Sequence, residues 1–170
     1  MHECFSPRGL CAGWNHTSDA VLERVFTQHR ADFDALLAEV QGDSQLKSIQ
    51  PRSIVYGDQS INVAESGVSE VERLGLPRER WDLYQKQLQR LGLAGGVFKT
   101  EGRIEFRVDP GSISNGDSYK GYEYSLSPPA RMLPSLDGYR IAPRDRTRFG
   151  GWLVHKRLTQ SWYLYLFVND

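Results

Sequence analysis

Residues 97–108 read VFKTEGRIEFRV, and this stretch decides the fold class of the 170-residue chain. Ile104, Phe106 and Val108 alternate with charged side chains, which is the period of a strand that buries one face. Glu101-Gly102 supplies a turn, so the stretch predicts an antiparallel hairpin. A half-buried antiparallel sheet is therefore expected around it.

Four further segments carry strand signals: Ser53–Val63, Ser118–Ser125, Gly151–Arg157 and Ser161–Val168. The first contains Gly57-Asp58, and Asn115-Gly116 precedes the second; both dipeptides suit the positive φ of a two-residue hairpin turn. The last segment is apolar or aromatic on both faces. Such a strand belongs in the centre of a sheet, or under an element that covers it.

Two amphipathic helices are expected, at 18–41 and 77–91. Apolar residues recur at spacings of three and four in both, and Ser18 can cap the first helix. Helices combined with a run of antiparallel strands predict an α+β fold, with both helices on one face of a mainly antiparallel sheet of about five strands. Residues 1–17 are expected to form a flexible arm before a single domain at 18–170.

The composition excludes several protein classes. Lys and Arg number 21 and Asp and Glu number 21, so the net charge of zero gives no general attraction to nucleic acid. No apolar run reaches the roughly 18 residues that a membrane-spanning helix needs. The N-terminus lacks the apolar core of a secretory signal, so the default compartment is the cytoplasm, with a periplasmic or envelope-tethered location as the alternative if a leader is missing.

No metal, cofactor or catalytic residue is predicted. Cys4 and Cys11 lack the close spacing of a zinc knuckle, and whether they form a disulfide stays open. The familiar nucleophile, zinc-protease, phosphate-loop and dinucleotide motifs are absent from the sequence. This favours a protein that is not an enzyme, although a site assembled from distant residues leaves no local motif.

A basic segment at 131–157 is the main candidate for binding. It carries seven Arg or Lys residues against two Asp, and the planar guanidinium group suits carboxylates or phosphates. The predicted binding residues are Arg140, Arg144, Arg146, Arg148 and Trp152, with Tyr122 and Tyr124 from a tyrosine-rich strand. Alternatively, these arginines pair with acidic residues of the helices, and the tyrosines pack across strands.

His155 offers a second hypothesis. A strand histidine beside Glu123 or Glu105 can act as a general base, with Tyr122 or Tyr124 positioning an anionic or sugar substrate. A pocket that brings His155 within hydrogen-bond reach of a carboxylate and a tyrosine hydroxyl would favour this hypothesis. Alternatively, His155 is an exposed strand residue.

The strings KGYEYS at 120–125, PPARMLPSLD at 128–137 and WYLYLF at 162–167 resemble a group of small uncharacterised bacterial proteins. Many members of that group carry a lipoprotein signal ahead of an amphipathic helix. Because the group is bacterial, the resemblance implies a bacterial origin. It supplies no activity.

The leading functional prediction is a non-enzymatic bacterial binding protein, of inhibitor or immunity type, whose basic segment contacts an acidic surface of another protein. The alternatives are a small enzyme that uses His155 and a strand glutamate, and a structural protein of the cell envelope.

Overall fold

The computed structural model describes residues 16–109, 118–139 and 151–168. These residues form helices and strands in the following order: α1 (Asp19–Gln28), α2 (Arg30–Gly42), β1 (Leu46–Ile49), β2 (Ser53–Tyr56), β3 (Gln59–Asn62), α3 (Val63–Ser66), α4 (Val68–Arg73), α5 (Arg78–Arg90), β4 (Gly96–Thr100), β5 (Arg103–Arg107), β6 (Ser118–Ser125), β7 (Trp152–Arg157) and β8 (Trp162–Val168).

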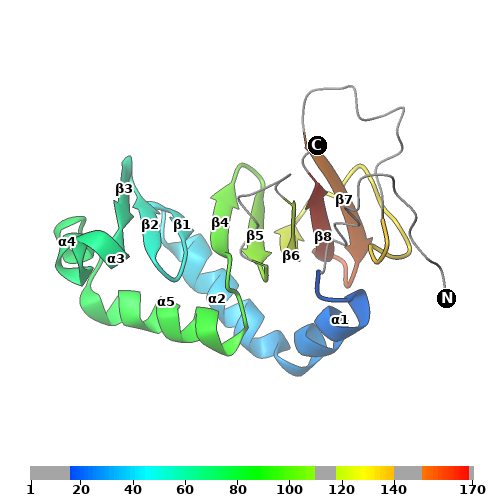
Figure 1. The fold of residues 1–170 in the computed structure, drawn as a ribbon, viewed down its shortest axis with the longest axis horizontal. Helices are drawn as coiled ribbons and strands as arrows, with labels where there is room; N and C mark the ends of the chain where they lie inside the picture. The colour runs from blue at the N-terminus through cyan, green and yellow to red at the C-terminus, as the bar shows by residue number, and fades with distance from the viewer. Residues whose placement is uncertain (1–15, 110–117, 140–150, 169–170) are drawn as a thin grey trace, which may run out of the picture.

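All eight strands belong to one antiparallel sheet in the order β3-β2-β1-β4-β5-β6-β8-β7 (Figure 1). Neighbours along the chain are mostly neighbours in the sheet, because short turns connect them. The Gly57 and Gly102 turns close the β2–β3 and β4–β5 hairpins with positive φ, which confirms both predicted turns. The Asn115-Gly116 turn lies outside the described residues, whereas β5 and β6 pair as expected.

The hydrophobic core lies between one face of the sheet and the helices. Phe26 of α1 and Phe33 of α2 contact Tyr122 of β6, with ring centroids 5.9 and 4.6 Å apart, respectively. Phe33 also meets Phe106 of β5 and Trp162 of β8. Figure 1 shows α1, α2 and α5 running past the strands on this side, which we call the helix face. The opposite side of the sheet is called the second face.

The α+β class and the antiparallel sheet are confirmed, but the expected sheet of about five strands is wrong. The sheet has eight strands, since β1 was not predicted and the hairpin at 53–63 joins the same sheet. The predicted helix at 18–41 is interrupted at His29, where φ is −114° and ψ is 21°. The described residues form five helices where two were expected. Besides the break at His29, the short helices α3 and α4 follow β3, and they lack the apolar period that would predict them.

The two edges of the sheet differ. Residues 131–133 run parallel to β7 along its outer side, where the His155 N–H donates to Arg131 O and the Leu133 N–H donates to His155 O. Among the described residues, β3 pairs only with β2. None of the described helices is long and apolar enough to cross a bilayer.

Candidate functional site

Strand β6 places charged side chains on both faces of the sheet. Lys120 and Tyr122 point to the helix face, and Glu123 points to the second face because successive side chains of a strand alternate. Lys120 and Glu123 are both buried, and each has a solvent-exposed fraction of only 2%. Buried charges are costly unless they are paired, so the partners of each residue indicate what it does.

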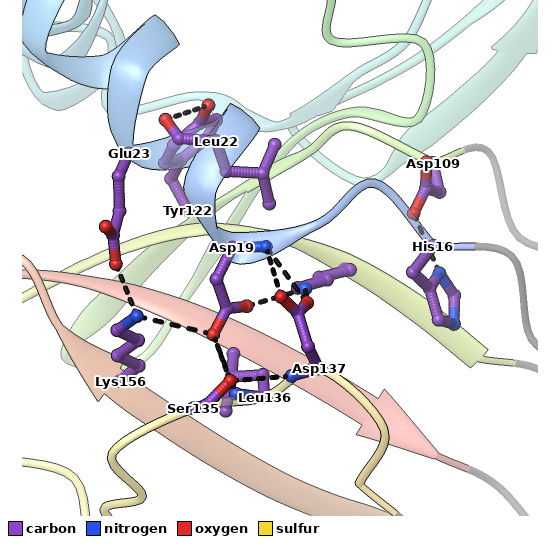
Figure 2. Close-up of polar contacts among 11 residues, drawn as sticks. His16, Asp19, Leu22, Glu23, Asp109, Tyr122, Ser135, Leu136, Asp137 and Lys156 are labelled. Atoms are coloured by element: carbon purple, nitrogen blue, oxygen red, sulfur yellow. Dashed lines mark hydrogen bonds and ion pairs between the residues drawn. The ribbon is translucent and has the colours of Figure 1, made fainter.

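On the helix face, Lys120 belongs to an ion cluster at the start of α1. Its Nζ lies 2.6 Å from Asp19 Oδ1 and 2.8 Å from Asp137 Oδ1. Asp137 also accepts a hydrogen bond from the Asp19 N–H, and Asp19 accepts bonds from the Ser135 hydroxyl and the Leu136 N–H. Figure 2 shows this convergence of the helix start, the loop around Asp137 and Lys156 of β7.

The ion cluster holds Asp19 in its charged form. Burial by itself raises the pKa of this carboxyl group, but hydrogen bonds and charge from Lys120, with the Leu136 and Ser135 bonds, lower the pKa to about 2. Tyr122 lies next to the cluster, and its hydroxyl donates to Leu22 O. These contacts fasten α1 and the 133–139 loop to the sheet, so the cluster is structural.

On the second face, two buried glutamates lie directly opposite each other. Glu105 of β5 pairs in register with Glu123 of β6, and both are at most 3% exposed. Arg107 Nη2 lies 2.9 Å from Glu105 Oε2, whereas Arg103 lies 3.3 Å from Glu105 and 3.8 Å from Glu123. Arginines on both sides therefore compensate a carboxylate pair that would otherwise repel itself.

His155 joins the second-face network from β7. Its Nε2 lies 3.2 Å from Glu123 Oε2, although β8 separates the two strands in the sheet. The His155 side chain is 4% exposed, so the contact is shielded from water. The histidine–glutamate pair that the sequence suggested is therefore present.

A pocket of about 490 Å³ opens beside this network. Arg103, Glu123, Trp152 and His155 contribute from strands of the sheet, and Arg131 contributes from the segment beside β7. The Arg131 guanidinium carbon lies 4.1 Å from the centroid of the Trp152 ring, which is a cation–π contact. Arg131 is exposed, so the pocket has a cationic rim above a buried polar wall.

Two nitrogen atoms on residues that line the pocket lack partners. Trp152 Nε1 and His155 Nδ1 are both buried, and neither has a hydrogen-bond partner within the described part of the chain. An unpartnered buried donor or acceptor costs about 1–3 kcal/mol, so such atoms are rare without a reason. Because Arg103, Glu123 and Arg131 also line this pocket, it is the strongest candidate for a ligand site.

The predicted binding residues separate into three groups. Arg140, Arg144, Arg146 and Arg148 lie outside the described residues, so their predicted role stays a prediction. Trp152 lines the pocket. Tyr122 is fully buried in the core and Tyr124 lies on the same helix face beside Trp162, so neither ring faces the pocket.

Sequence reasoning missed Arg103 and did not single out Arg131 among the basic residues. Arg103 has no distinguishing pattern, because charged residues at alternate positions of an antiparallel strand usually face water. The one available signal for Arg131 was its position in the proline-rich stretch before β7.

No group of three or more His, Cys, Asp or Glu residues suited to a metal ion occurs among the described residues. Cys4 and Cys11 lie outside them. No family model, curated protein or solved structure matches the chain.

Proposed function

We propose that this chain is a non-enzymatic bacterial binding protein, of inhibitor or immunity type, that receives an acidic group of a protein partner at the pocket rim. The observation that carries the proposal is Arg131, an exposed arginine whose guanidinium carbon lies over the Trp152 ring. Tryptophan and arginine are the residue types that most often dominate binding energy at protein interfaces.

The charges around Arg131 support an acidic partner. Lys156, in the same basic segment, is already paired with Asp19 and Glu23 of α1. Within the described residues, Arg131 forms no ion pair with a carboxylate, which supports a role in binding an acidic group. Stacking on the indole also restricts the guanidinium group, which lowers the entropy lost when a carboxylate binds.

The test compares two matched arginines. Arg157 is also exposed, and its guanidinium carbon lies 6.0 Å from the Tyr163 ring centroid, but it lines a different pocket. Proteins captured from a bacterial lysate by the wild-type chain should be retained by Arg157→Glu and lost by Arg131→Glu. Equal capture by both variants, or loss with both, would contradict the proposed role of Arg131.

A small enzyme is a second candidate, and the His155–Glu123 contact favours it. If His155 Nε2–H donates to Glu123, Nδ1 keeps a lone pair and has the chemistry of a general base. Against this candidate, Nδ1 is buried, and no tyrosine hydroxyl takes part in the pair. Chromogenic esters, phosphate esters and glycosides provide the test, with Glu123→Gln as the inactive variant and Glu101→Gln as its surface control; no turnover by the wild-type chain would remove the candidate.

A further inference from the structure

We infer that the pocket binds a small organic carboxylate, with the carboxylate group on the Arg131 guanidinium beside the Trp152 ring. The inference rests on the proposed function because both use Arg131, but it names the chemical group and a ligand that needs no protein partner. Two observations support it: the charge at the pocket, and its size and lining.

The charge at the pocket favours an anion. Arg103 and Arg131 contribute two positive charges, and Glu123 contributes one negative charge. Arg103 lies within 4 Å of both Glu105 and Glu123, whereas Arg131 forms no ion pair with a described residue. The arginine that remains available is at the rim, where a carboxylate can accept two parallel N–H bonds from it.

The size and lining of the pocket fit a compact ligand with an apolar body. A volume of about 490 Å³ falls within the range of about 300–1,000 Å³ that small-molecule sites occupy. Leu153, Pro129 and Ala130 supply an apolar wall beside the charged groups. An aromatic or short aliphatic carboxylic acid combines these two properties.

Benzoate is a suitable probe, and benzamide is its uncharged counterpart. The chain has four tryptophans, so its ¹H–¹⁵N spectrum contains few indole N–H signals, and Trp152→Phe identifies one of them by its loss. Benzoate should shift the Trp152 indole signal in a saturable manner, and benzamide should not. Arg131→Gln should weaken benzoate binding by about tenfold or more, whereas Arg157→Gln should leave it within about twofold.

Several outcomes would overturn the inference: an unmoved Trp152 signal, equal binding of benzamide, or full benzoate binding by Arg131→Gln. Tighter binding of inorganic phosphate than of benzoate would also overturn it, because it would show a general anion site without use of the apolar wall. If no carboxylate binds but protein capture still depends on Arg131, this inference fails and the proposed function stands.

Discussion

Strand β6 carries a cluster of charged side chains on each of its two faces. The clusters differ in whether their buried polar atoms all have a hydrogen-bond or ion-pair partner. On the helix face, Lys120, Asp19 and Asp137 satisfy one another together with loop groups. On the second face, Glu123 is paired, but His155 Nδ1 beside it is buried without a described partner. A completed network stabilises a fold, whereas an incomplete one at a pocket leaves interactions for a ligand. The four predictions below test this difference.

The largest effect is expected from removal of Lys120. Lys120→Met leaves the buried Asp19 and the exposed Asp137 without their common counter-charge, and breaking a buried ion pair costs about 3–5 kcal/mol. The free energy of unfolding from urea titration measures the loss. Lys47→Met removes an exposed lysine that pairs with Asp58, so it should change stability little. Similar losses in both variants would show that the buried cluster has no special structural role.

Acid should weaken the same cluster. The folded-state pKa of Asp19 is lowered to about 2, below its unfolded value, so its stabilisation is present above about pH 4 and is lost as the pH falls to about 2. The lost amount is about 2 kcal/mol. Asp19→Asn cannot gain a proton there, so the stability difference between wild type and variant should shrink by this amount over that pH range. A constant difference would contradict the assignment.

A smaller effect is expected from Glu123→Gln on the second face. The amide keeps an acceptor for His155 but removes the charge beside Arg103, which should cost about 1–2 kcal/mol in the free energy of unfolding. Glu101→Gln in the exposed β4–β5 turn is the matched control and should be neutral. A loss as large as that of Lys120→Met would mean that the second-face network also primarily stabilises the fold.

The smallest effect on stability is expected at the pocket rim. Arg131→Gln removes an exposed stack on Trp152 and should change the free energy of unfolding by about 0.5–1 kcal/mol at most. Binding measurements on the same variant should show the loss described above. A large loss of stability would place Arg131 among the structural residues instead.

The sequence predicts elements that have a clear period, and fails where the period is absent or misleading. The hairpin at 97–108 and helix α5 follow from alternation and helical spacing. The break at His29 is invisible because the apolar stripe continues from Phe26 to Phe33 across it. Strand β1 has only four residues, too few for alternation to be recognised.

Less of the candidate site could be predicted. His155 and Glu123 were named as a possible pair, but their contact depends on β8 lying between β6 and β7, and a strand order of this kind is not written in local spacing. Arg103 and Arg131 approach the same pocket from β5 and from the β7 edge. The strand order of the whole sheet brings these two residues together, whereas sequence patterns describe only neighbours along the chain.

The unequal edges of the sheet limit how copies of this protein could associate. Residues 131–133 already occupy the middle of the outer side of β7, whereas β3 has one described neighbour. If two molecules joined by main-chain bonding, β3 against β3, the combined sheet would end at a β7 strand on each side. Assembly by this route would therefore stop at a closed pair, and it would not continue into a fibre.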